Sequence, residues 1–208
     1  MSFPTRAQAH ELLEQAHLAN PGPWYGHSLY AGTAAELIGS ALGLDADKAY
    51  VSGLLHDIGR YEGVTNLHHV VSGYRYLQAH GFDGCARYTL THSFFIKKLN
   101  SFVGTHDISA EEKLFLEQYL CNVQYDDYDK LIQLCDALAL PDGFCIIEQR
   151  IVDVALRYGL NEYALEKWRA MFAIKAGFEA RIGKSIYALL PGITERIIGK
   201  AEKAVLVG

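Results

Sequence analysis

Apolar side chains recur along most of the chain at the spacing of an α-helix. Between residues 51 and 58 they stand at positions i, i+3, i+4 and i+7, and the segments 116–123 and 131–138 repeat this spacing. Such a period puts the apolar positions on one face of a helix, which can then pack against a core. No segment shows the apolar and polar alternation of a half-buried strand. The pattern therefore predicts an all-α fold with essentially no sheet.

Glycine, proline and capping residues divide the chain into helices. Asn20-Pro-Gly-Pro precedes one helix, Gly43 closes it, Asp45 is a candidate N-cap for the next, and Pro141-Asp-Gly separates two later helices. The predicted helices span residues 4–19, 25–42, 46–58, 66–80, 83–92, 110–123, 127–139, 144–158, 162–182 and 191–205. The stretch from about 93 to 109 has weak periodicity, so a long loop or a broken helix is expected there.

The length and composition are those of one folded domain. The 208 residues are 50% hydrophobic and 21% charged, as in ordinary globular proteins. The net charge is −5 and the nineteen Lys and Arg residues are scattered, which argues against duplex nucleic acid as a partner. The chain shows neither a signal-peptide core nor an apolar run of membrane-spanning length, and its four cysteines form no CxxC pair. We therefore expect a cytoplasmic protein.

Histidines and carboxylates supply the candidate chemistry. The chain has nine histidines, of which the informative ones are His27, the pair His56-Asp57, the pair His68-His69, and His92. Imidazoles and carboxylates are common ligands of divalent cations. His56 and Asp57 end an apolar helix, where a rotation of about 100° per residue lets both side chains face one ion. Gly59 follows and is expected to let the chain turn away.

The His-Asp doublet is one part of a longer series of motifs. It stands in LLHDIGR, 29 residues after His27, and is followed by HHVVSGYRYL, THSF and LIQLCDALAL. Over roughly residues 25–140 this series resembles the HD-domain superfamily of metal-dependent phosphohydrolases. The resemblance implies a single domain, residues 1–208, with a helical HD core at about 20–140. A C-terminal helical extension, to which no chemistry can be assigned, would occupy about 144–208.

The resemblance also implies a metal site. In the family the first His, both residues of the doublet and a distal Asp bind a common ion, and these correspond here to His27, His56, Asp57 and Asp136. Asp136 is preferred over the carboxylates at 126–129, which lie at a helix start and oppose the helix dipole. A carboxylate among apolar neighbours in the middle of a helix is costly unless it is paired or coordinated.

A second metal ion is implied for some members of the family. In these the doublet Asp bridges both ions and two further histidines complete the second site, here His69 and His92. The chain departs from one dinuclear subgroup, because Ser93 follows His92 where that subgroup has another His. One or two divalent ions per chain are therefore expected, from among Mn, Fe, Co, Ni, Zn and Mg.

The implied reaction is hydrolysis of a phosphoester, with Asp57 holding the metal ions that catalyse it. A metal-held water attacks phosphorus in such a site. Arg60, one helical turn beyond Asp57, has the spacing to bind a substrate phosphate. His69 or His92 would serve as general acid if one metal binds. The expected partner is a small phosphorylated substrate, a nucleotide in the first instance, and neither duplex nucleic acid nor a membrane.

Alternative interpretations stay open from the sequence. A minority of proteins with this fold use a di-iron centre to oxygenate carbon, and others would bind a nucleotide without catalysis. An exposed apolar face of the C-terminal helices could support a homodimer. His68 is interpreted as the exposed neighbour of His69, and Trp168 as a packing residue rather than a stacking platform.

Overall fold

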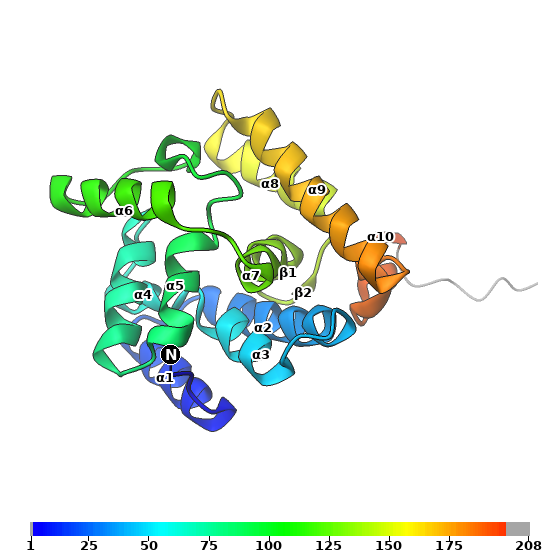
Figure 1. Ribbon diagram of the computed structural model, residues 1–208, viewed down its shortest axis with the longest axis horizontal. Coiled ribbons are helices and arrows are strands. Elements are labelled where there is room, and N and C mark those ends of the chain that lie inside the picture. Colours follow the sequence, from blue (N-terminus) through cyan, green and yellow to red (C-terminus); the bar gives the residue numbers. More distant parts are fainter. Residues whose placement is uncertain (1, 199–208) are drawn as a thin grey trace, which may run out of the picture.

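The computed structural model describes residues 2–198 and consists almost entirely of helices (Figure 1). Its α-helices are α1 (Arg6–Ala19), α2 (Trp24–Ala41), α3 (Ala46–Leu55), α4 (His68–Ala79), α5 (Asp83–Thr91), α6 (Ala110–Asn122), α7 (Asp127–Leu138), α8 (Ile147–Tyr158), α9 (Ala164–Ile182) and α10 (Ile193–Ile198). Short 3₁₀ segments form η1 (Ile58–Glu62), η2 (Leu99–Ser101) and η3 (Ile186–Leu189), and β1 (Ala139–Leu140) pairs with β2 (Gly143–Phe144). The predicted all-α class is confirmed.

Local capping explains where several helices begin. Thr5, Ser109 and Asp126 each form a capping box with the residue three positions later, at the starts of α1, α6 and α7. Asp45 accepts a hydrogen bond from the backbone N of Lys48, so its predicted capping role at α3 is confirmed. Most predicted helices therefore match within a few residues. The last predicted helix agrees over α10, and its residues 199–205 lie outside the described part of the chain.

Helices α2, α3 and α7 form the centre of the fold (Figure 1). Small residues let α2 and α3 approach each other closely. A Cβ on Gly53 would lie 2.7 Å from the carbonyl oxygen of Ala31 and 2.9 Å from Cα of Gly32. Fully buried aliphatic side chains fill the space between these helices. This close approach brings His27 of α2 and His56, at the end of α3, within contact distance.

The chain after α3 departs from the predicted helix. α3 ends at Leu55, His56 keeps helical angles, and Asp57 leaves them with φ −102° and ψ 13°. η1 then packs on α4, and a Cβ on Gly59 would lie 2.0 Å from the carbonyl oxygen of His69. Gly59 is not among the glycines with positive φ. Glycine is needed at this position for close packing on α4, and the chain leaves the helix two residues earlier, at Asp57.

A small hairpin follows α7 where no sheet was expected. β1 pairs antiparallel with β2 across the turn formed by Pro141 and Asp142. Because the hairpin occupies these residues, α8 begins at Ile147 rather than at 144. Strands of two residues are too short to show an alternating pattern in the sequence. The hairpin packs on α2, since a Cβ on Gly26 would lie 2.2 Å from the carbonyl oxygen of Pro141.

The C-terminal extension, here the described residues 145–198, places α8 and α9 together beyond α7 (Figure 1). Several of its apolar side chains are exposed, namely Val152, Leu156, Leu160 and Leu165. The homodimer stays a prediction. Within residues 2–198, every helix is too short or too polar to cross a membrane.

Gly59→Ala should lower the free energy of unfolding. Backbone atoms of His69 and Gly73 lie 2.0 and 2.5 Å from the Cβ position, and overpacking of this kind costs roughly 1–3 kcal/mol or more. Gly177→Ala in α9 is the matched control, because no described atom lies within 4 Å of its Cβ position. Alanine there should leave stability unchanged or raise it by up to about 1 kcal/mol. Urea unfolding measures both variants, and an unchanged midpoint for Gly59→Ala would contradict the packing described here.

Candidate metal centre

Six predicted ligand side chains meet at the ends of helices. They come from the first turn of α2 (His27), the residues after α3 (His56 and Asp57), the start of α4 (His69), the residue after α5 (His92) and the last turn of α7 (Asp136). Five of them are buried, and the side chain of Asp136 is 21% exposed. Elements far apart in the sequence therefore converge on one cluster.

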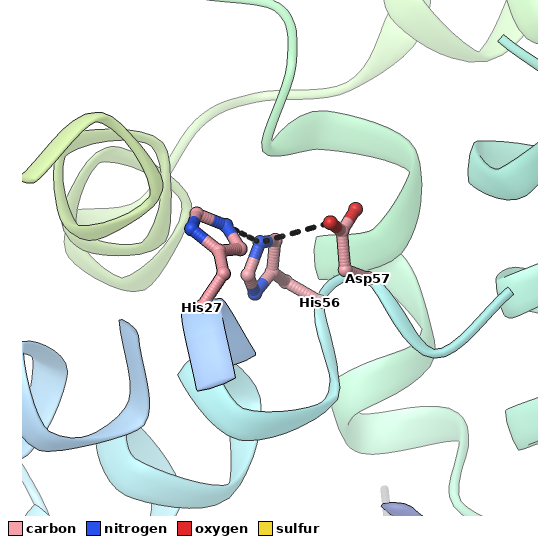
Figure 2. A group of neighbouring side chains, drawn as sticks. All are labelled: His27, His56 and Asp57. Atoms are coloured by element: carbon pink, nitrogen blue, oxygen red, sulfur yellow. Dashed lines mark hydrogen bonds and ion pairs between the residues drawn. The ribbon is translucent and has the colours of Figure 1, made fainter. Parts of the chain in front are cut away.

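The first part of the cluster contains His27, His56 and Asp136. Nε2 of His27 lies 3.1 Å from Nε2 of His56 and 3.1 Å from Oδ1 of Asp136. Nε2 of His56 lies 3.7 Å from the same oxygen and 3.9 Å from Oδ2 of Asp57. Figure 2 shows His27 and His56 pointing toward each other, with Asp57 beside His56. His27, His56 and Asp57 offer ligand atoms close enough together to hold one ion.

The second part of the cluster contains His69, His92 and the other oxygen of Asp57. Oδ1 of Asp57 lies 3.1 Å from Nε2 of His69 and 3.5 Å from Nε2 of His92. The two Nε2 atoms are 3.3 Å apart. This trio also offers atoms close enough together for one ion. The two carboxylate oxygens of Asp57 thus face different groups of histidines, as a carboxylate that bridges two ions would.

A backbone carbonyl orients each of the four imidazoles. Nδ1 of His27 donates to the carbonyl oxygen of Ala139 (3.1 Å), and Nδ1 of His56 to that of Gly53 (2.7 Å). Nδ1 of His69 donates to the carbonyl oxygen of Asn66, and Nδ1 of His92 to that of Thr89 (2.9 Å). A carbonyl oxygen only accepts, so each Nδ1 carries a proton and Nε2 of a neutral ring presents its lone pair to the cluster. Such outer hydrogen bonds are typical of metal-binding histidines.

The donor set fits a divalent cation. With both rings neutral, the lone pairs of His27 and His56 face each other at 3.1 Å, and those of His69 and His92 at 3.3 Å. Lone pairs at these distances repel, and a cation between them turns the repulsion into coordination. Oδ1 of Asp57 is buried and accepts no hydrogen bond from the described residues, which is costly without a cation. The residues present are therefore suited to hold metal.

Electrostatics favour ionised carboxylates in the cluster. Burial raises the pKa of Asp57, but Arg60 and the nearby histidines outweigh it and hold that pKa well below its usual value. Burial likewise opposes ionisation of Asp136, whose pKa the histidines hold low. Burial, aided by Arg60, lowers the pKa of His69 to about 4. Burial also lowers the pKa of His56, yet the two carboxylates outweigh it and raise that pKa, so metal binding should displace a proton there.

A cavity of about 600 Å³ opens onto the cluster. Its lining includes five of the six cluster side chains, all except His56. The segment 93–109 contributes Phe95, and α8 and α9 contribute Arg150, Lys167 and Trp168. The segment contains η2 between irregular stretches, as expected for a long loop or broken helix beside the site. A cavity of this size, with apolar and charged sides, suits a small organic ligand.

Arg150 and Lys167 are candidate functional residues that the sequence did not single out. No motif marks either residue, and both lie far along the chain from the doublet. The available signal was a Lys beside an aromatic residue, Trp168, on a predicted helix. Trp168 was assigned to packing, which is incomplete because its side chain also lines the cavity.

The remaining predicted residues lie in or beside the site. Arg60 lines the cavity, and its Nε donates to Oδ2 of Asp57 at 2.6 Å. Its contact with substrate stays a prediction. His68 forms a hydrogen bond with Glu62 and is absent from the described cavity lining, as expected for a neighbour of His69. Asp126 and Asp129 form the capping box of α7, and Asp127 accepts a hydrogen bond from Arg181 at 2.8 Å, which accounts for these carboxylates without a metal.

Comparison with protein families places the cluster in a known context. The HD domain model matches residues 24–140, more than half of the chain, and the matched range contains all six cluster residues. The range ends before α8. Searches of the curated proteins and of the solved structures found no match. The chain therefore belongs to the HD-domain family, within the superfamily of metal-dependent phosphohydrolases.

Proposed function

We propose that the protein hydrolyses a phosphoester of a small molecule, with a nucleotide as the expected substrate, by means of water activated at two divalent metal ions. The observation that carries this proposal is the cluster itself, in which four oriented imidazoles and two ionised carboxylates meet at a cavity. Membership of the HD-domain family supports the reaction class. The position of Asp57 between the two groups of histidines supports two ions rather than one.

The protein's own residues prepare the site for this chemistry. A bound divalent cation would lower the pKa of a coordinated water and take up charge on the phosphoryl oxygens. The ionised carboxylates of Asp57 and Asp136 offset part of the cation's charge in a buried place. The backbone carbonyls hold the rings, so that the Nε2 atoms need no reorientation when the ion enters.

Arg60 is suited to bind the phosphate of a substrate. Its Nε is bonded to Asp57, and its Nη1 lies at 3.5 Å from the carbonyl oxygen of Thr65. This leaves guanidinium donors available at the cavity surface. A guanidinium fixed beside a metal-binding carboxylate can bind phosphoryl oxygens with charge-assisted hydrogen bonds.

The protonation of His69 favours a ligand role over the role of general acid. A pKa of about 4 leaves its ring neutral at pH 7, with no proton on Nε2 to give to a leaving group. The same lone pair is what a metal ligand requires. We therefore include His69 in the second ion site with His92 and Asp57.

The side chains that line the cavity support a nucleotide as substrate. Aromatic side chains of Trp24, Phe95 and Trp168 line it together with cationic ones. Aromatic faces can stack on a nucleobase, while the cations suit phosphate groups. A phosphorylated metabolite without a ring would leave the apolar surface unused.

Protein purified without chelator should carry close to two divalent ions per chain, and His56→Ala should lose most of this metal. His68→Ala is the matched control, because His68 pairs with Glu62 outside the cluster. Elemental analysis of both variants and the wild type measures the effect. Absence of metal in the wild type, even after manganese or nickel is added, would contradict the mechanism. Iron as the native metal would call for a test of oxygen consumption.

Asp57→Asn should lower phosphate release from nucleotides and phosphomonoesters by at least about a hundredfold. Asparagine keeps the size of the side chain and still accepts a bond from Arg60, so the fold should survive. Its neutral amide cannot serve as an anionic ligand between the two groups of histidines. The measurement is a phosphate-release screen with the metal found in the wild type. Activity of the wild type that persists in a folded Asp57→Asn variant would disprove the assigned site.

Arg60→Met should lower kcat/KM by about tenfold to a hundredfold, the usual loss for a charge-assisted phosphate contact. Metal content should remain, because Arg60 contacts the ligand Asp57 without itself being one. Arg75→Met is the control, since Arg75 forms an ion pair with Glu112 and is not part of the described cavity lining. If Arg60→Met turned over substrate like the wild type, Arg60 would only pair with Asp57.

A further inference from the structure

Lys167 carries a positive charge in the cavity without a matching negative partner. It lies on α9, partly buried, and lines the same cavity as the cluster. Among the described residues no carboxylate lies within 4.0 Å of its Nζ, whose one hydrogen bond is a long contact of 3.5 Å to Ser101 O. An ammonium withdrawn from water with so little compensation is costly. Burial accordingly lowers the pKa of Lys167.

Arg150 of α8 is a second cation with spare donors at the same place. Its Nη2 lies 3.7 Å from Oδ1 of Asp136 and its Nη1 lies 3.9 Å from Oδ2 of Asp153, too far for hydrogen bonds. Its guanidinium makes no hydrogen bond with the other described residues. Asp136 raises the pKa of Lys167 and Arg150 lowers it, so the three groups lie within electrostatic reach of one another.

The other cations of the described cavity lining are already paired. Arg60 donates to Asp57 at 2.6 Å, and Arg157 donates to Asp153 at 2.5 Å. Lys167 has no carboxylate within 4.0 Å among residues 2–198, and Arg150 approaches carboxylates only at 3.7 and 3.9 Å, without a hydrogen bond. The cavity cations that lack a hydrogen bond to a carboxylate therefore lie on α8 and α9.

The C-terminal extension is held by contacts with the loop of residues 93–109. Nδ2 of Asn161 donates to the carbonyl oxygens of Asn100 and Ser101 at 3.1 and 3.4 Å. Lys98 of the loop pairs with Glu166 of α9 at 2.8 Å. These contacts hold α9, and Lys167 with it, at a set place beside the cavity.

We propose that Lys167 and Arg150 form an anion subsite that binds a second anionic group of the substrate while its scissile phosphoryl group lies at the His–Asp cluster. This inference rests on the proposed function for the place of the scissile group. It narrows the substrate to phosphoesters with a second phosphate group that carries its own charge, such as bisphosphates and esters of diphosphate. A substrate with a single phosphate at the cluster would leave Lys167 uncompensated.

The test uses two phosphonates that cannot be hydrolysed at phosphorus, methylphosphonate with one anionic group and methylenediphosphonate with two. Calorimetric titration of the metal-loaded wild type and of Lys167→Met gives the dissociation constants. Lys167→Met should weaken methylenediphosphonate binding about tenfold, a change of about 1.4 kcal/mol, and shift methylphosphonate binding less than about twofold. Metal content, measured before and after titration, separates loss of the subsite from loss of the ions.

Arg169→Met is the matched control for charge. Arg169 lies on the same helix, is exposed and is not among the described lining residues, so its replacement removes one positive charge away from the cavity. Both affinities should stay as in the wild type. Arg150→Met should repeat the selective loss seen with Lys167→Met. Equal losses for the two phosphonates, or no loss in Lys167→Met, would overturn the subsite.

Turnover measured separately distinguishes the two proposals. Selective loss of diphosphonate binding in a protein that hydrolyses no phosphoester would support the subsite and refute the proposed reaction. Hydrolysis that depends on Asp57, in a protein whose Lys167→Met variant binds both phosphonates normally, would support the reaction and refute the subsite.

Discussion

The site depends on the orientation of four imidazole rings whose lone pairs converge. Each ring is held through Nδ1 by a carbonyl at a helix end, so Nε2 has no freedom to turn away from its neighbours. Without a cation, facing Nε2 lone pairs and the Oδ1 of Asp57, which accepts no hydrogen bond from the described residues, would oppose folding. A cation relieves both costs at once. Metal binding and folding should therefore be coupled.

Close packing of backbones is what allows this convergence. Gly53 lets α3 approach α2, Gly59 lets η1 lie on α4, and Gly26 lets the hairpin reach α2. Each contact supports a ligand or the carbonyl that orients one. The hairpin brings the Ala139 carbonyl to His27, for example. These glycines thus act by allowing close approach of backbones, and a methyl group at any of them would displace a side chain of the cluster without contacting it.

The sequence predicted the parts of this site that leave a periodic or motif signal. Apolar spacing predicted the helices, and the His-Asp pattern with its resemblance to the HD-domain family predicted the six side chains that meet in the cluster. The role of Gly59 was missed, because a sequence carries no information on how closely two backbones approach. The hairpin was missed because two-residue strands have no period. Arg150 and Lys167 were missed since a cation without a motif gains meaning only from its neighbours in space.

The division between core and extension has a chemical counterpart. The family match ends at residue 140 and contains the cluster, while α8 and α9 contribute the cations of the described cavity that lack a hydrogen bond to a carboxylate. Metal ions held by the His–Asp cluster would bind any phosphoryl group, so the cluster by itself would determine the reaction but not the substrate. Selectivity requires contacts at a distance from the reacting phosphorus, where substrates differ. The extension supplies charged and aromatic side chains at that distance, through Lys167 and Trp168. In this fold the core would determine the reaction, and the extension would determine the substrate.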